Sequence, residues 1–288
     1  GIKAMQQRPL LLFSALWTVL AVSVKAVALG PYAPEAGVEG SEAIHMDDSR
    51  FAGWAVGSRD LVYGEDVAQE WRQPEKALGP AAGTSMDIVC LGRGGRITFE
   101  FSPPIADGPG PDFAVFENAF NDFFLELGFV EVSSNGKDFV RFPNDSQTAG
   151  PVGSFGIVDP TNITGFAGKY RQGYGTPFDL DALQNASPHL DVQSVRYVRL
   201  IDIVGDGSYT DTSGDIIYDP YPTSSSPGLD IDAIGVLNEK ETNTVTLTIE
   251  HRGLDYNGEG TGSGTYAQGA EVTWSVKSPW PRSGGDNG

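Results

Sequence analysis

Five segments of the chain alternate apolar and polar side chains with a period of two, and residues such as Gly, Pro, Asn and Asp lie between them. That period is typical of a β-strand with one buried face. The chain also has 37 Gly and 19 Pro among its 288 residues, which favours turns and short strands over long helices. The sequence therefore predicts an all-β fold, most simply a β-sandwich or jelly roll with long loops. The five segments are residues 87–101, 112–118, 127–142, 194–203 and 228–237.

Local patterns in these segments predict faces and turns. In residues 87–101 the side chains on one face are apolar, namely Ile97, Phe99 and Phe101. The pair Asn135-Gly136 predicts a tight hairpin turn, because this pair is favoured in two-residue turns. Only short stretches, such as residues 178–185, have a pattern that fits a helix.

The N-terminal segment has the features of a signal peptide. Met5 reads as the start, with residues 1–4 as upstream carry-over, and Arg8 precedes an apolar run over residues 9–24. Ala26-Val27-Ala28 then supplies small residues at a cleavage site. The alternative is a membrane anchor, but the apolar run is short for a span. We therefore expect residues 1–28 to be removed and the mature chain to be secreted or displayed on the cell surface, without a transmembrane span.

Composition changes divide the rest of the chain. Residues 29–238 hold the strand pattern of the predicted sandwich domain, and residues 239–243 form a polar linker. Residues 244–279 give alternating segments around a Gly-rich middle, which predicts a small second β module. Residues 280–288 are a polar, Gly-rich tail that we expect to be flexible.

The charge and cysteine content restrict the partners. The net charge is −19, and removal of residues 1–28 takes away three basic residues and no acid, which lowers it to −22. Nucleic acid and anionic membranes are therefore excluded as partners, whereas cations, neutral sugars and proteins remain open. Cys90, the only cysteine, lies in an apolar run and is expected to be a buried hydrophobic residue rather than a nucleophile. Without disulfides, loops this long can be stabilised by bound metal.

The strongest charge feature is an acidic loop. No Lys or Arg lies between Arg199 and Lys240, while seven Asp and Glu239 do. Oxygen donors of this kind suit Ca²⁺, although the spacing does not match an EF-hand. We expect the loop to bind at least one cation, and the alternative is a solvated acidic loop. The predicted ligands in this loop are Asp206, Asp211, Asp215 and Asp219.

A second group of oxygen donors lies on the segment 112–118. Asp112, Glu117 and Asn118 stand beside large apolar residues, and Glu117 shares a strand face with Phe113 and Val115. A buried carboxylate needs a cation or hydrogen-bond donors. We predict either a cation site formed by these three residues or an ion pair from Glu117 to an arginine, such as Arg199 or Arg141.

Loop aromatic residues are candidates for ligand binding. Sugar rings stack on exposed Trp and Tyr, and polar side chains orient them. The alternative is that these aromatic residues fold back onto the core. The candidates are Tyr170, Arg171, Tyr174, Trp54, Trp71 and Tyr218.

The sequence gives little support for catalysis. His45, His189 and His251 are scattered without a metal-binding spacing, and no G-x-S-x-G motif is present. A carboxylate pair of the glycosidase type remains open, but acids are so abundant that no pair stands out. We therefore predict that the protein is not an enzyme.

Three segments resemble the galactose-binding-like, discoidin-type jelly rolls: "ELGFVEVSSNGKDFVRF", "VRYVRLIDI" and "GLDIDAIGVL". More specifically, "GPDFAVFENAF" and "AGKYRQGYGTPFDL" resemble a group of uncharacterised bacterial exported cell-surface proteins of the PEP-CTERM-associated type. Residues 244–279, with "GTYAQGAEVTW", are similar to divergent InlB B-repeat modules of surface proteins. In the galactose-binding-like family an acid on the closing strand often binds structural Ca²⁺, which makes Asp230 or Asp232 a further candidate ligand.

The function expected from these features is non-catalytic binding of carbohydrate or of another envelope or matrix component, with Ca²⁺ ordering the acidic loops. One alternative is a structural or adhesive surface protein without a small-molecule site. The other is an enzyme that acts on polysaccharides.

Overall fold

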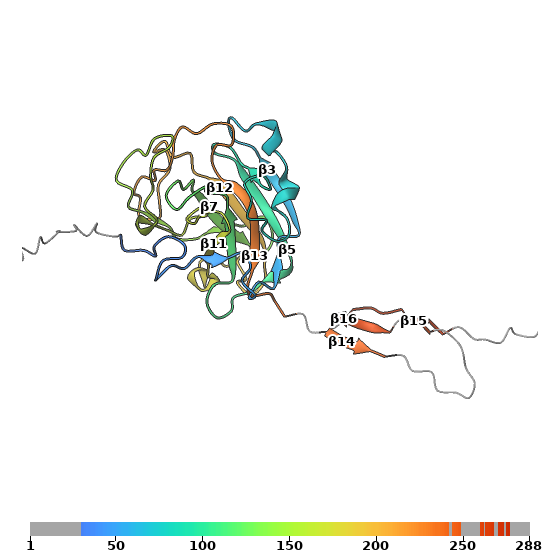
Figure 1. The fold of residues 1–288 in the computed structure, drawn as a ribbon. Helices are drawn as coiled ribbons and strands as arrows, with labels where there is room; N and C mark the ends of the chain where they lie inside the picture. Colours follow the sequence, from blue (N-terminus) through green and yellow to red (C-terminus); the bar gives the residue numbers. More distant parts are fainter. Residues whose placement is uncertain are drawn as a thin grey trace, which may run out of the picture.

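The computed structural model describes residues 30–241 and, farther along the chain, residues 244–248, 260–261, 263–267, 270–273 and 275–276. The predicted signal peptide and the predicted tail, residues 280–288, lie outside the described residues. Figure 1 shows that the part from residue 30 to about 240 forms one body of strands and long loops.

The first sheet of this body is antiparallel, with the strand order β1, β11, β6, β13 and β2, and β4 also pairs with β13. Every residue of β6 and β13 is buried. One face of β6 carries Phe113 and Val115 into the main core, and the other carries Ala114 and Phe116 into a cluster beneath the loop residue Phe51. The strands are β1 Ile44–His45, β2 Gly53–Trp54, β4 Val89–Cys90, β6 Phe113–Glu117, β11 Tyr174–Phe178 and β13 Asp230–Val236.

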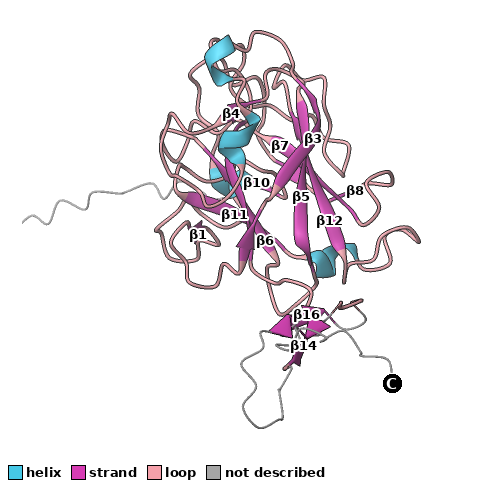
Figure 2. Ribbon diagram, turned by 90° about the vertical axis from the view of Figure 1, so that its right-hand side faces the viewer, coloured by secondary structure: helices cyan, strands magenta, loops and turns pink. Residues whose placement is uncertain are grey.

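The second sheet is also antiparallel and has the order β3, β5, β12, β7 and β8. The predicted apolar face of Ile97, Phe99 and Phe101 is buried in the main core. Figure 2 shows β5 and β12 in one layer and β6 and β11 in the other, so the prediction of an all-β sandwich is confirmed. The strands are β3 Gly57–Val62, β5 Arg96–Ile105, β7 Gly128–Ser133, β8 Val140–Arg141 and β12 Val195–Asp202.

Shorter elements lie in the connections. Strands β9 (Asp145–Ser146) and β10 (Ile163–Thr164) form a two-stranded ladder. The only helices of the described residues are single 3₁₀ turns, and residues 180–183 confirm the predicted helical stretch. They are η1 Gln69–Trp71, η2 Pro74–Ala77, η3 Pro160–Asn162 and η4 Leu180–Leu183. No helix in the described part of the chain is long and apolar enough to cross a membrane.

The described residues of the predicted second module form four short antiparallel strands. Strand β14 (Thr244–Leu247) pairs with β16 (Gly264–Ala267), and β15 (Gly260–Thr261) pairs with β17 (Ser275–Val276). The resemblance of this region to bacterial repeat modules stays a prediction.

The hairpin of β7 and β8 differs from the predicted tight turn. Val132 and Val140 are its last paired residues, so the connection is longer than two residues. The Asn135 side chain accepts hydrogen bonds from the backbone nitrogens of Lys137 and Asp138, both at 2.9 Å. Asn135 therefore stabilises a wider loop through its side chain instead of forming a two-residue turn.

One end of the sandwich brings strand ends from both sheets together. Strand β6 ends at Glu117 beside the start of β13, and β12 ends at Asp202 beside the start of β7. Asp202 links the sheets, because its carboxylate accepts a hydrogen bond at 2.8 Å from the backbone nitrogen of Leu229, just before β13. This end of the sandwich carries the site described next.

Candidate functional site

A pocket opens at this end of the sandwich, and we call it the acidic pocket. Its cavity has a volume of about 260 Å³. Acids line it from the end of β6, from the loop before β7 and from the start of β13, and residues 222–226 supply hydroxyl groups. No Lys or Arg is among its lining residues. The polar side chains in its wall are Glu117, Asn118, Glu126, Ser154, Thr223, Ser224, Ser226 and Asp230.

Backbone amides and a hydroxyl hold two of the acids. Glu117 accepts hydrogen bonds from the backbone nitrogens of Ala119 at 2.7 Å and Asp230 at 3.3 Å. Glu126 Oε1 accepts hydrogen bonds from the Thr223 hydroxyl and from the backbone nitrogen of Gly228, both at 2.8 Å. These bonds fix the carboxylates in position, so the shape of the pocket is built into the fold.

Two other oxygens of the pocket have no partner. Oδ1 of Asp230 and Oδ1 of Asn118 are buried and accept no hydrogen bond. The residues themselves are only 6% and 5% exposed. A buried acceptor without a donor costs free energy, on the order of 1–3 kcal/mol. Both residues line the acidic pocket, so a ligand with hydrogen-bond donors or a positive charge would bind beside them.

The acids of this end of the sandwich resist ionisation. Burial, followed by repulsion from Asp230, raises the pKa of Glu117 and that of Glu126 well above the usual range. Burial raises the pKa of Asp230 to about 7 and that of Asp202 to about 8. Burial raises the pKa of Asp219 as well, and repulsion from Asp202 is the next largest cause. A positive group in the pocket would favour the ionised forms and relieve this repulsion.

Three phenyl groups, two of them exposed, line the acidic pocket. Phe120, Phe124 and Phe155, which we call the phenyl shelf, line it together with the acids. The rings of Phe120 and Phe124 stack with centroids 6.0 Å apart, and those of Phe124 and Phe155 with centroids 6.3 Å apart. Phe155 is 92% exposed and Phe120 is 69% exposed. The site thus combines an acidic floor with an apolar rim.

The predicted acidic loop is split between separate places. Asp211 and Asp215 lie with Asp145 so that one carboxylate oxygen of each is within 4.8 Å of the others, and we call this group the loop triad. Asp211 also accepts a hydrogen bond at 2.9 Å from the backbone nitrogen of Ser146, whose Oγ is buried without a partner. Asp145 was not among the candidate ligands predicted from the sequence.

The other two aspartates of the loop do not join this triad. Asp206 accepts hydrogen bonds from the backbone nitrogen and hydroxyl of Ser208, so it stabilises its own turn. Asp219 is buried, and its Oδ2 accepts a hydrogen bond at 2.8 Å from the backbone nitrogen of Leu127. Of the four predicted loop ligands, the structure therefore brings only Asp211 and Asp215 together, and a cation site in this loop stays a prediction.

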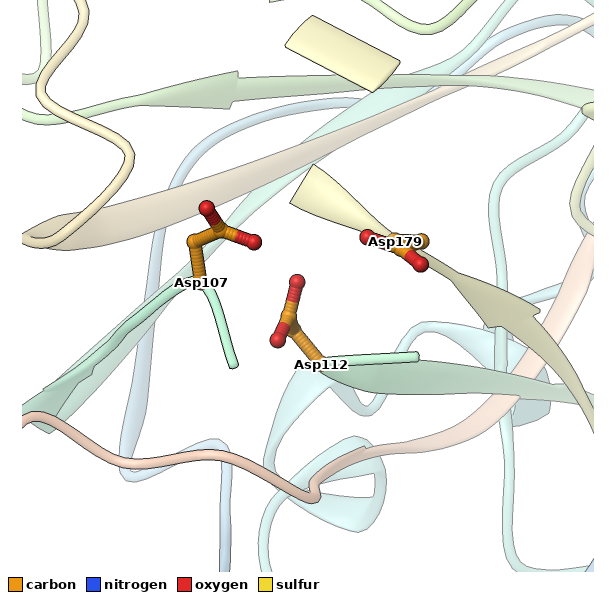
Figure 3. Close-up of side chains that lie close together, drawn as sticks. All are labelled: Asp107, Asp112 and Asp179. Carbon is orange, nitrogen blue, oxygen red and sulfur yellow. The ribbon is translucent and has the colours of Figure 1, made fainter. Parts of the chain in front are cut away.

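Asp112 lies at the opposite end of β6 from Glu117, so these two candidate ligands do not share a site. Its carboxylate accepts hydrogen bonds from the backbone nitrogens of Gly108 and Leu180 and from the Asn238 amide. The three carboxylates of this second group point towards one another (Figure 3), and they belong to Asp107, Asp112 and Asp179. With both oxygens of Asp112 occupied, its role is to tie loops together.

Asp232 and Asp230 have different contacts and do not form one site. Its two carboxylate oxygens accept hydrogen bonds from the backbone nitrogens of Ala82 at 2.9 Å and Gly83 at 2.8 Å. Asp232 thus anchors a loop, whereas Asp230 lines the pocket. The arginines considered for Glu117 are also elsewhere, since Arg141 and Arg199 both pair with Glu131.

The predicted aromatic loop around residue 170 turns inward. Tyr170 is 1% exposed and cannot stack on a ligand, so this prediction is wrong. Arg171 donates hydrogen bonds to the carbonyl of Ala36 and to Asp122, and its guanidinium lies over the ring of Tyr174, 4.7 Å from the centroid. These contacts favour the alternative in which the loop covers the core.

The remaining aromatic candidates are also partly buried. Trp54 packs against Phe51 and Phe116. Trp71 packs against a small buried cluster, and its Nε1 has no hydrogen-bond partner. Tyr218 lines a shallow pocket beside Asp215, away from the phenyl shelf. None of these three lines the acidic pocket.

Sequence reasoning missed Glu126 and the phenyl shelf. A usable signal was present, because "NAFNDFFLELGF" (residues 118–129) places Phe120, Phe123 and Phe124 between polar residues in a loop. Comparisons of the chain with protein-family models, with curated proteins and with solved structures give no match. The geometry of the site therefore carries the functional argument.

Proposed function

We propose that the chain is a non-catalytic binding protein that acts outside the cell and recognises carbohydrate in the acidic pocket, with Ca²⁺ ordering the acidic loop. The observation that carries the proposal is the pocket itself, because Asn118 and Asp230, each with a buried oxygen that has no partner, line it together with the phenyl shelf. The apolar run and cleavage pattern before residue 29 and the resemblance to galactose-binding-like domains support export and binding.

A sugar matches both parts of the site. Its hydroxyl groups donate hydrogen bonds, and the open acceptors of Asn118 and Asp230 need donors. Its ring carries an apolar face, which stacks on aromatic side chains such as those of the phenyl shelf. A cavity of about 260 Å³ is slightly smaller than the pockets of roughly 300–1,000 Å³ that enclose drug-sized ligands, so it suits about one ring.

The loop triad is the proposed Ca²⁺ site. Ca²⁺ takes oxygen ligands, and the converging carboxylates of Asp145, Asp211 and Asp215 provide three. The buried, unpartnered Ser146 Oγ lies beside them, because the Ser146 backbone nitrogen donates to Asp211. An ion there would join the acidic loop to β9, and through Asp219 the same loop contacts the segment that carries Glu126.

Fixed acids favour binding over catalysis. The carboxylates of Glu117 and Glu126 accept hydrogen bonds from backbone amides, which positions them as acceptors in the wall. A polysaccharide-acting enzyme predicts release of reducing ends or unsaturated products from a polysaccharide, and a structural or adhesive protein predicts no sugar binding.

A glycan array, followed by calorimetry, tests the proposal. We expect retention of one sugar class in Ca²⁺, weaker retention in EDTA, and loss of retention in Glu117→Gln and Asp230→Asn. Asp107→Asn is the control, because it makes the same acid-to-amide change at the opposite end of the sandwich. No retention of any sugar by the intact, folded protein would refute carbohydrate binding, and product release would reassign the pocket to an enzyme.

A further inference from the structure

The acidic pocket has a floor that suits an ammonium group. In the described residues, the groups of three acids whose oxygens converge within 4.8 Å are Asp145, Asp211 and Asp215 in the loop triad and the group around Asp112, so the acids of the pocket are spaced more widely. A primary ammonium has three N–H donors and donates to amide and carboxylate oxygens alike, whereas Ca²⁺ takes six to eight oxygen ligands. The pocket offers such a mixed set of acceptors, with Asn118 beside Glu117 and Asp230 and no Lys or Arg in its lining.

Three residues that line the acidic pocket carry acceptor oxygens. Oδ1 of Asp230 and Oδ1 of Asn118 have no partner, and Glu117 contributes its carboxylate from the adjoining strand. Each of these side chains is at least nine-tenths buried. A cationic donor bound there would give hydrogen bonds to the two unpartnered oxygens. The same group would offset the repulsion between Glu117 and Asp230.

The phenyl shelf offers an apolar surface beside the acids. The phenyl shelf continues from the acidic pocket into an adjoining apolar cavity of about 220 Å³, whose wall includes Phe123 and Ile157. The only polar side chain in its lining is that of Asn121, whose carboxamide oxygen already accepts hydrogen bonds from the backbone nitrogens of Phe123 and Phe124. This cavity thus favours an apolar ring face, and phenyl rings also attract a nearby cation.

We propose that the ligand is a carbohydrate with a free amino group, an amino sugar whose ammonium binds Glu117, Asn118 and Asp230 while the next ring lies on the phenyl shelf. This inference rests on the proposed function and names its ligand class. The net charge of −19 adds a long-range attraction for cationic oligomers.

Calorimetry with a glucosamine trimer and its fully N-acetylated counterpart tests the inference, because acetylation removes the charge and keeps the sugar chain. We expect the glucosamine trimer to bind at least tenfold more tightly. Asp230→Asn and Glu117→Gln should each weaken it at least tenfold, and Asp107→Asn should not. Phe155→Ala, at a residue that is 92% exposed, should weaken the trimer more than the monomer without changing the melting temperature.

The possible failures are distinguishable. Equal or tighter binding of the acetylated trimer would overturn the amino-sugar inference and leave carbohydrate binding in place. Equal binding of a lysine trimer would assign the pocket to amines in general. Ca²⁺ could also compete with the glucosamine trimer. If Ca²⁺ displaces the trimer from the wild-type protein but not from Asp145→Asn, the sugar binds at the loop triad. Binding of neither trimer, with no other sugar retained, would remove the proposed function as well.

Discussion

The backbone nitrogen of Asp230 donates a hydrogen bond to the carboxylate of Glu117 at 3.3 Å, while the Asp230 side chain keeps one oxygen without any partner. The two acids sit on neighbouring strands, β6 and β13, so their proximity is fixed by the sheet and does not depend on a flexible loop. Backbone amides hold the carboxylate of Glu117, whereas one oxygen of Asp230 has no hydrogen-bond partner. This pairing makes the end of the sandwich sensitive to positive charge and to pH.

The stability of the ligand-free protein should fall as the pH rises. Burial raises the pKa of Asp230 to about 7 and that of Asp202 to about 8, above the value of about 4 in an unfolded chain. The folded state therefore holds these protons over a range in which the unfolded state has released them. Their contribution is present in full below pH about 4 and is lost as the pH passes through 7 and 8.

Urea denaturation at pH 5.5 and 8.5, in EDTA, measures this effect. Asp230→Asn removes one of the buried charges, so we expect it to raise the free energy of unfolding at pH 8.5 by about 2 kcal/mol and to flatten the pH dependence. Asp107→Asn should leave the slope unchanged. A wild-type protein that gains stability from pH 5.5 to 8.5, with no benefit from Asp230→Asn, would contradict this account.

The sequence predicted the central strands β5, β6, β7, β12 and β13, but it did not predict β3, β11 or the site. Alternation identified β5 and its face because that pattern is local, and Ile97 to Phe101 depend only on their neighbours in sequence. The site joins Glu117 to Asp230, which are 113 residues apart, and Glu126 to Gly228, which are 102 apart. No local pattern predicts such pairs. The aspartates of the acidic loop are close in sequence and were all candidate ligands, yet Asp219 is buried and accepts a hydrogen bond from Leu127.

Ca²⁺ should stabilise the protein through the loop triad. An ion that binds only the folded state raises stability by mass action, and at 100 times the dissociation constant the gain is about 2.7 kcal/mol. We therefore expect millimolar Ca²⁺ to raise the melting temperature by about 5 °C over EDTA. The double variant Asp211→Asn/Asp215→Asn should lose this rise, while Asp206→Asn should retain it. An identical melting temperature in Ca²⁺ and EDTA would show that the loop is only solvated.

Asp112 should contribute to stability and not to binding. It is fully buried and accepts three hydrogen bonds from two loops and from Asn238. Asp112→Ala leaves these donors without a partner, so we expect a loss of about 3–5 kcal/mol in urea denaturation. Asp179→Ala, which removes only the cap of η4, should cost about 1 kcal/mol. Loss of ligand binding by a folded Asp112 variant would place that residue in the functional site.

Two glycines of the acidic loop provide a matched test of how Asp219 is held. Both have a positive φ, +78° at Gly205 and +92° at Gly214. A Cβ at Gly205 would lie 1.8 Å from the Asp219 carboxylate oxygen Oδ1, whereas a Cβ at Gly214 would meet nothing within 4 Å. Gly214→Ala should therefore cost about 1 kcal/mol for backbone strain alone. Gly205→Ala should cost at least about 2 kcal/mol more, because Asp219 must move and release the backbone nitrogen of Leu127.

The Gly205→Ala variant should also weaken ligand binding, because Leu127 directly follows the pocket residue Glu126. Calorimetry on both glycine variants would separate this effect from backbone strain. Equal losses of stability and unchanged binding in the two variants would show that Asp219 does not support the pocket.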